Sequence, residues 1–320
     1  MEENMKIVFL DAATVGGDVS LEPLRCLGEL VCWQTSTPAE ALERVRDAEV
    51  LIINKVKVDR ELVDAASSLK LICEAATGVN NIDIGYAAEK GIPVKNVAGY
   101  STESVVQLTF MHILNLVCKA RQYDGKVKSG DYSAGGIFTD VSMPFRELAR
   151  KRMGIIGMGT IGRRVAAVAS AFGMEVSYFS TSGTSHCHEY PSVTLERLLS
   201  ESDVVSIHAP LNEATKSLIG TKELEKMKPD AILLNMGRGG IVDESALVRA
   251  VDSGVIAGAA ADVFETEPLP QDHPFLKAAH PERLSFSPHI GWASIEARER
   301  LVAGIARNIE TYIATEKSKL

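Results

Sequence analysis

Residues 154–166 read GIIGMGTIGRRVA, with glycine at positions 157, 159 and 162. An apolar strand pattern precedes these glycines and a helical pattern follows, which is the context in which G-x-G-x-x-G spacing binds a dinucleotide. Gly157 permits the tight turn, Gly159 lets the backbone approach a pyrophosphate, and Gly162 lets helix and strand pack closely. A tight strand-to-helix turn alone would also use such glycines. Because strand, helix and following strand are all present, the pattern predicts dinucleotide binding at the start of the helix.

Short apolar runs alternate with helical patterns on both sides of this loop. In the pattern over 37–48, Thr37 and Glu40 form a predicted capping box, and Pro38 occupies the first turn. Parallel strands need a connecting helix, so the alternation implies βαβ units and a parallel sheet. It stops at an irregular stretch over 130–151 and then restarts, which predicts two α/β domains with a boundary near residue 101. The expected strands are 6–10, 50–54 and 69–75 in the first domain and 153–159, 175–180, 203–210, 231–237, 255–263 and 283–290 in the second, with a long helix from about Thr102 and a last helix over 294–314.

The strand that follows the glycine loop ends at Ser180. A carboxylate at this position would bind the adenosine ribose and repel a 2′-phosphate. Ser180 and Thr181 instead open a run of hydroxyl side chains without negative charge, so the usual barrier to NADP is absent. The nearest cations in sequence are Arg163 and Arg164, although Arg163 also fits a solvated position on the helix face. We therefore expect the protein to accept NAD or NADP, with NADP preferred.

The bulk composition is that of an ordinary globular protein. Its 320 residues suffice for about two domains, and the net charge of −8 argues against a nucleic-acid partner, which would favour a basic surface. The five cysteines show no paired spacing, as is typical of reduced thiols in a cytoplasmic protein. The longest apolar run, 104–118, is short for a membrane span and is interrupted by Gln107, His112 and Asn115. We expect that run to be a buried helix and the protein to have no membrane partner.

One short run of metal-binding residue types is His186, Cys187 and His188. Adjacent residues cannot easily face one ion, and no fourth ligand follows at a regular spacing. We expect a solvated loop and no metal site here.

Downstream of the glycine loop, polar side chains stand at the ends of three expected strands. Arg238 follows one strand, Asp262 and Glu267 follow the next, and His289 follows the last. Ligands of open parallel sheets bind beyond the carboxyl ends of the strands, so these segments are expected to converge on one crevice. Taken singly, each residue also fits a structural role, as a turn cap, a loop acid or a core histidine. Together, a guanidinium that binds oxygens, an imidazole that transfers a proton and a neighbouring carboxylate suit chemistry on a keto acid.

At these segments the sequence resembles the D-isomer-specific 2-hydroxyacid dehydrogenases over nearly the whole chain. The most specific matches are GMGTIG, NMGRGG, DVFETEP and PHIGWAS. Within the family the chain is most similar to glycerate dehydrogenases, also called hydroxypyruvate reductases, through NKV at 54–56, AATGVNNID at 75–83 and NVAGYSTESVVQ at 96–107. One departure concerns the cofactor, because NAD-dependent members carry Asp where Ser180 stands.

The resemblance implies a role for each matching position. Arg238 would bind the substrate's carboxylate and carbonyl oxygen, His289 would be the general acid and base, and Glu267 would hold His289. The backbone amides at Gly78 and Val79 would take the substrate carboxylate. The other implied positions contact the cofactor: Thr77, the pyrophosphate turn at Gly157, Gly159, Thr160, Ile161 and Gly162, the ribose site at Ser180 and Thr181, Met236 and Gly237 beside the nicotinamide, and Asp262 at its carboxamide.

The resemblance also implies how the chain is organised. A Rossmann NAD(P)-binding domain, 102–292, would be inserted into a flavodoxin-like substrate domain made of 1–101 and 293–320. Each domain would be a doubly wound parallel sheet. Family members are usually homodimers joined through their cofactor domains, so we expect a homodimer.

The function we expect is the NAD(P)H-dependent reduction of hydroxypyruvate to D-glycerate, with glyoxylate as a second substrate. The nearest alternative is the same chemistry on another, bulkier 2-keto acid. A different alternative is a nucleotide-sensing binding protein, because transcriptional corepressors of this family use the same fold. An inactive paralogue is the third.

Overall fold

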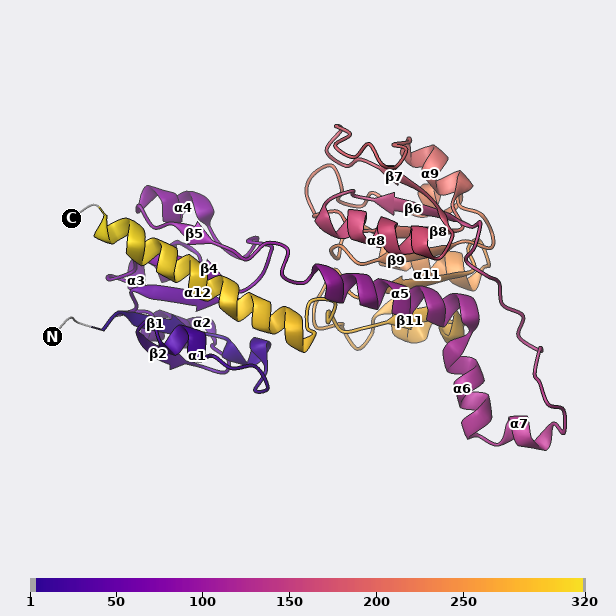
Figure 1. The fold of residues 1–320 in the computed structure, drawn as a ribbon, viewed down its shortest axis with the longest axis horizontal. Helices are drawn as coiled ribbons and strands as arrows, with labels where there is room; N and C mark the ends of the chain where they lie inside the picture. Colours follow the sequence, from indigo (N-terminus) through magenta and orange to yellow (C-terminus); the bar gives the residue numbers. More distant parts are fainter. Residues whose placement is uncertain (1–3, 319–320) are drawn as a thin grey trace. The chain divides into compact units, whose positions relative to one another are not determined.

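A computed structural model describes residues 4–318 of the chain (Figure 1). The chain divides into two compact units, one running to Ser101 and resuming at Trp292, the other spanning Thr102–Gly291. The chain returns to the first unit at Trp292, one residue before the boundary that the resemblance implies. Every strand pairing in both units is parallel, and the predicted class of two parallel-sheet α/β domains is confirmed. Among the described residues, no helix has the length and apolar character that a membrane span requires.

The first unit is built on a five-stranded sheet in the order β2-β1-β3-β4-β5, the flavodoxin-like order. Helix α2 begins with the predicted capping box, in which Thr37 and Glu40 satisfy each other's backbone N–H groups. Two strands were not foreseen, β2 and β5, and both lie at the sheet's edges. The strands are β1 Lys6–Phe9, β2 Glu29–Cys32, β3 Val50–Ile53, β4 Leu71–Glu74 and β5 Val94–Lys95, and the helices are η1 Ala12–Val15, α1 Glu22–Arg25, α2 Pro38–Arg44, α3 Arg60–Ala65, α4 Ile84–Glu89 and α12 Ile295–Lys317.

The last helix, α12, completes the core of the first unit. Ser294 caps its first turn by accepting a hydrogen bond from the Ala297 N–H. Leu301, Ile305 and Ile309 are fully buried in the cluster that covers one face of the sheet, and helices α2, α3 and α4 cover the other (Figure 1). The first unit is therefore assembled from both ends of the chain.

The second unit contains a six-stranded sheet in the order β11-β10-β9-β8-β6-β7. Helices α5 and α8 pack on one face, and α9, α10 and α11 pack on the other, each against a separate apolar cluster. All six strands coincide with predicted ones. They are β6 Arg152–Ile156, β7 Glu175–Phe179, β8 Val204–Ile207, β9 Ile232–Asn235, β10 Gly258–Ala261 and β11 Leu284–Phe286, and the helices are α5 Thr102–Cys118, α6 Ala120–Lys128, α7 Asp131–Ala134, α8 Thr160–Ala171, α9 Leu195–Glu201, α10 Thr221–Leu224, α11 Glu244–Asp252, η2 Pro274–Lys277 and η3 Pro281–Arg283.

The strand order fixes where each unit can bind a ligand. In the second unit, β7 and β8 follow β6 in sequence but lie on opposite sides of it, so the strand order reverses at β6 and β8. In the first unit, the same reversal occurs at β1 and β3. The crevice beyond the carboxyl ends of the strands at such a reversal is the usual ligand site of an open α/β sheet.

Residues 119–147 form an arm on the second unit (Figure 1). Its helices α6 and α7 lie within the described residues, and neither buries a side chain. Six large hydrophobic side chains of this segment are exposed: Val127, Tyr132, Ile137, Phe138, Val141 and Phe145, with Phe138 90% exposed.

Candidate active site

The glycine loop lies at the strand reversal of the second unit. Gly157 has a φ of +94°, a conformation that side-chain-bearing residues rarely adopt. A Cβ there would lie 2.8 Å from the Ala209 backbone nitrogen, so the turn after β6 packs directly on the segment after β8. A Cβ at Gly162 would lie 2.2 Å from the Gly157 carbonyl oxygen, so the first turn of α8 packs on the same turn. Both glycines are required by these close approaches.

The start of helix α8 fits the pyrophosphate of a dinucleotide. Gly159 is its N-cap, and within the described chain no side chain caps the helix and no acidic residue lies in its first turn. The N–H groups at Thr160 and Ile161, together with the helix dipole, are therefore available to an anion. A Cβ added at Gly159 would meet no described atom within 4 Å, which leaves room for phosphate oxygens against the backbone.

The end of β7 carries a cluster of hydroxyl groups. Ser180 Oγ donates to the Thr184 carbonyl oxygen at 2.7 Å and lies 3.1 Å from Ser182 Oγ, while Thr181 is partly buried beside it. The guanidinium of Arg163 donates to the His186 carbonyl oxygen at 2.6 Å, which holds it against this loop.

The other nearby cation, Arg164, is instead paired with Glu103, at 2.8 Å. Of the two arginines considered from sequence, only Arg163 contacts the hydroxyl-rich loop through a hydrogen bond that the structure records.

His289 and Glu267 meet beyond the ends of β11 and β10. Their Nδ1 and Oε2 atoms are 2.7 Å apart. A carboxylate only accepts hydrogen bonds, so the shared proton lies on Nδ1 and the second ring nitrogen, Nε2, is the one that can exchange a proton with a ligand. The other carboxylate oxygen of Glu267 accepts the Phe264 N–H at 3.0 Å, which fixes the acid's orientation.

Asp262 is almost fully buried immediately after β10. Its Oδ1 accepts the Ser287 hydroxyl at 2.6 Å and the Ile290 N–H at 2.9 Å, and its Oδ2 accepts the Gly291 N–H at 2.7 Å. Burial raises the pKa of Asp262, while these donors and the nearby His289 oppose the rise. The carboxylate thus ties down the segment that carries His289, in addition to any contact with the nicotinamide carboxamide.

Arg238 stands on the loop that follows β9. Its Nη1 donates to the Gly237 carbonyl oxygen at 2.8 Å, and its own carbonyl accepts from Asn235 Nδ2 at 2.9 Å. A Cβ at Gly239 would lie 1.9 Å from the Phe264 carbonyl oxygen, so this loop packs directly on the segment leading to Glu267. The loops of the arginine and of the His–Glu pair are therefore neighbours.

Two positions expected beside the nicotinamide lie just before Arg238. Met236 is buried, and its N–H donates to the Ile207 carbonyl oxygen at 3.1 Å. A Cβ on Gly237 would lie 2.7 Å from the Ala209 carbonyl oxygen, so this backbone also packs on the segment after β8.

In the first unit, Thr77, Gly78 and Val79 form the loop after β4. Asn96 Nδ2 donates to the Thr77 carbonyl oxygen at 2.6 Å, and Thr77 Oγ1 donates to the Val97 carbonyl oxygen at 3.3 Å. Val79 packs against the apolar cluster on the α2, α3 and α4 face of the sheet, and this contact holds the loop against that face.

Sequence reasoning missed the side chains that hold the neighbouring loops of this unit. Asp11, after β1, accepts the backbone N–H groups of residues 54–56. Asn81 donates to the Val56 carbonyl at 3.0 Å and to the Glu74 carboxyl at 3.1 Å. Glu74 is fully buried, and burial raises its pKa to about 8. The available signal was a carboxylate directly after the strand β1, the position where polar side chains meet at a strand reversal.

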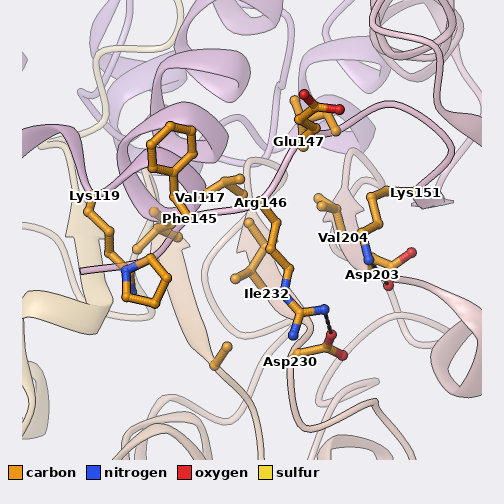
Figure 2. Close-up of a pocket in the computed structure, with 14 residues that line it drawn as sticks. Val117, Lys119, Phe145, Arg146, Glu147, Lys151, Asp203, Val204, Asp230 and Ile232 are labelled. Atoms are coloured by element: carbon orange, nitrogen blue, oxygen red, sulfur yellow. Dashed lines mark hydrogen bonds and ion pairs between the residues drawn. The ribbon is translucent and has the colours of Figure 1, made fainter. Parts of the chain in front are cut away.

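A separate cavity of about 170 Å³ opens at the amino ends of the strands of the second sheet, the end opposite to the candidate site (Figure 2). Its walls come from the end of α5, the base of the arm and the amino ends of β8 and β9. Arg146 pairs with Asp230 at 3.1 Å, and Lys151 lies beside Asp203. None of the expected site residues lines it. Across residues 4–318, no cluster of three or more His, Cys, Asp or Glu is arranged to hold a metal.

Comparison with known proteins identifies this architecture. Residues 110–291 match the NAD-binding domain of the D-isomer-specific 2-hydroxyacid dehydrogenases. Glycerate dehydrogenase of Methylorubrum extorquens is 36% identical over 97% of this chain and 96% of its own. D-lactate dehydrogenase of Aquifex aeolicus, solved with NAD and lactic acid, is 29% identical with a TM-score of 0.83, covering 98% and 97% of the two chains. The NADPH-dependent glyoxylate/hydroxypyruvate reductase of Sinorhizobium meliloti is 27% identical with a TM-score of 0.84, covering 97% and 95%.

Proposed function

The chain belongs to the D-isomer-specific 2-hydroxyacid dehydrogenase family, oxidoreductases that act on CH–OH groups, and we propose that within it the protein reduces hydroxypyruvate to D-glycerate, with glyoxylate as a second substrate. The observation that carries the proposal is the 2.7 Å pair of His289 and Glu267 beside the Arg238 loop. Similarity to a glycerate dehydrogenase supports the choice of substrate.

The proposed mechanism assigns one task to each side chain. Arg238 binds the carboxylate and keto oxygen of the substrate and stabilises the negative charge that develops on that oxygen. His289 donates the Nε2 proton to the same oxygen, while Glu267 holds Nδ1 and stabilises the charged ring. The nicotinamide, when bound through the glycine loop, supplies the hydride.

Steady-state kinetics with three keto acids test the substrate assignment. Hydroxypyruvate, glyoxylate and 4-methyl-2-oxopentanoate would each be measured with NADH and with NADPH. We expect the largest kcat/KM for hydroxypyruvate. A larger kcat/KM for the branched substrate would replace this proposal by the reduction of a bulkier keto acid, and no turnover of any of them would contradict the enzyme assignment.

We also propose that NADPH is the preferred cofactor. Ser180 and Thr181 bring hydroxyl groups rather than a carboxylate to the end of β7, and Arg163 is held against the same loop by the His186 carbonyl. Hydroxyl donors and one guanidinium suit a 2′-phosphate, and no negative side chain among residues 180–186 would repel it.

Replacing Ser180 with aspartate should reverse this preference. The new carboxylate would bind the ribose hydroxyls of NAD and repel a 2′-phosphate, and such like-charge contacts cost several kcal/mol. We expect the ratio of kcat/KM for NADPH over NADH to fall by about 10²-fold. Ser180→Asn, which is similar in size but neutral, should shift the ratio far less. An unchanged ratio in Ser180→Asp would contradict the placement of the 2′-phosphate beside residue 180.

The remaining proposals concern assembly and location. We propose a homodimer formed through the exposed hydrophobic residues of the arm, because an isologous contact would cover the same six side chains on both copies. We propose a cytoplasmic protein without nucleic-acid or membrane partners, which is supported by the net charge of −8 and by five cysteines that form no disulfide.

A charge at the arm should disrupt this dimer. We expect the wild type to have twice the mass of the chain by light scattering after size exclusion, and Phe138→Asp to shift it toward the monomer, because the substitution buries an unpaired carboxylate in the contact. Leu276→Asp is the matched control, since Leu276 is also exposed, in the same unit and outside the arm. An arm variant that stays dimeric would place the interface elsewhere.

A further inference from the structure

Helix α5 contributes a buried histidine that the proposed mechanism does not use. His112 has no exposed surface, and its ring lies between two serines of the segment that forms and follows β11. Its Nδ1 is 2.8 Å from Ser285 Oγ, and its Nε2 is 2.9 Å from Ser287 Oγ. Both serines are buried as well. Helix α5 is thereby linked by hydrogen bonds to the strand that precedes His289.

The direction of each hydrogen bond follows from the chemistry of the groups. Asp262 can only accept, so the Ser287 hydroxyl donates to it, at 2.6 Å. Ser287 Oγ must then accept from His112, which places the ring proton on Nε2. Burial lowers the pKa of His112 to about 4, so the ring is neutral near pH 7 and its Nδ1 accepts from Ser285. The four buried groups form one chain of donors that ends on Asp262.

Asp262, at the end of this series of hydrogen bonds, holds the backbone around His289. Asp262 accepts the N–H groups of Ile290 and Gly291, the two residues after His289. His289 itself has a φ of +54°, in the left-handed region that is uncommon for residues other than glycine. Residues in such conformations persist only where the surroundings hold them. The three hydrogen bonds that Asp262 accepts from this segment hold the backbone on both sides of His289 in place.

We propose that His112 is a positioning residue for the reduction: by donating to Ser287 it fixes the hydroxyl that orients Asp262, and Asp262 in turn fixes the backbone from which His289 presents Nε2 to the substrate. The inference rests on the proposed function, in which His289 transfers the proton. It assigns His112 no contact with substrate or cofactor. It differs from a purely structural role, in which the ring would only pack α5 against the sheet.

Loss of the hydrogen bonds that His112 makes should affect turnover more than substrate binding. His112→Leu introduces an apolar side chain of related size and removes both hydrogen bonds. We expect kcat to fall by about 10-fold or more, because a small misplacement of the reactive group is costly, while KM for the keto acid changes less than about twofold because Arg238 is untouched. His112→Gln, which can still donate to Ser287, should recover most of the lost turnover.

A control and a double variant separate positioning from packing. Thr109→Val also replaces a buried polar side chain of α5, but the Thr109 hydroxyl donates only to its own helix, at the Val105 carbonyl. It should leave kcat unchanged. Ser287→Ala should lower kcat as much as His112→Leu, and the double variant should be no slower than Ser287→Ala alone, since both act through one path.

These measurements can contradict the positioning role of His112 without contradicting the proposed function. If His289→Ala is slow but His112→Leu or Ser287→Ala has wild-type kcat, the positioning role is wrong and the proposed function stands. Additive losses in the double variant, or no recovery with glutamine, would also refute it. If His289→Ala itself turns over normally, the failure lies in the proposed function. Should His112→Leu not fold, Ser287→Ala and His112→Gln carry the same comparison.

Discussion

Replacing His289 with alanine is expected to lower kcat for hydroxypyruvate reduction by about 10²- to 10⁴-fold. The imidazole is the proposed source of the proton that the new hydroxyl group receives, and Glu267, 2.7 Å away, keeps the ring oriented. Without the ring, the developing alkoxide would have to take its proton from water. Steady-state assays that follow NADPH consumption at saturating hydroxypyruvate would measure the loss in kcat.

A matched control for this variant exists in the same unit. His280 also pairs with a glutamate, Glu282, at 3.2 Å, but on the exposed surface beside η3. His280→Ala should therefore leave turnover at the wild-type level. Equal rates for wild type and His289→Ala would remove His289 from the mechanism.

The same assignment predicts how activity depends on pH. Reduction needs His289 protonated, so its rate should fall as pH rises; oxidation of D-glycerate needs the ring neutral, so its rate should fall as pH drops. Profiles that run in the same direction for the two reactions would contradict the proton assignment.

Replacing Arg238 with glutamine should lower kcat/KM by about 10³-fold. Part of that loss is ground-state binding of the carboxylate, and part is stabilisation of the charge on the keto oxygen, for which a single donor is worth about 10²- to 10³-fold. We expect KM to rise and kcat to fall together. Arg238→Lys keeps the charge but not the planar fork, and it should remain about 10²-fold below wild type.

Arg146 provides the control for this substitution. It is an exposed arginine of the same unit, and it pairs with Asp230 near the amino ends of the strands, away from the candidate site (Figure 2). Arg146→Gln should keep wild-type kinetics. A kcat/KM for Arg238→Gln within a few-fold of wild type would mean that another group binds the keto acid.

The sequence was sufficient for the central strands and insufficient for the edges. Strands such as β3 and β9 are buried on both faces and are written as unbroken apolar runs, which is why they can be recognised. β2 lies at a sheet edge with no fully buried residue, and β5 is two residues long, so neither leaves such a run. The sequence marked residues 130–151 as irregular but did not predict an arm there, because the apolar side chains of that segment face no core.

The candidate site divides in a similar way. Arg238, Glu267 and His289 stand on the loops that follow three parallel strands, and the carboxyl ends of such strands are where ligand-binding residues are expected to converge. The partners that hold them cannot be found that way. His112 and Ser287 are 175 residues apart in sequence, and nothing local marks the histidine as more than one polar residue in an apolar helix.

The use of both chain ends to build the first unit has a consequence for biosynthesis. During translation, the strands of that unit leave the ribosome first, but the buried face of α12 that must cover them is made last. The second unit, by contrast, is encoded without interruption and has its full set of core residues before α12 emerges. The nascent N-terminal sheet must therefore wait, with one apolar face uncovered, while about 190 intervening residues are synthesised, which makes it the part of the newborn chain most in need of chaperone protection.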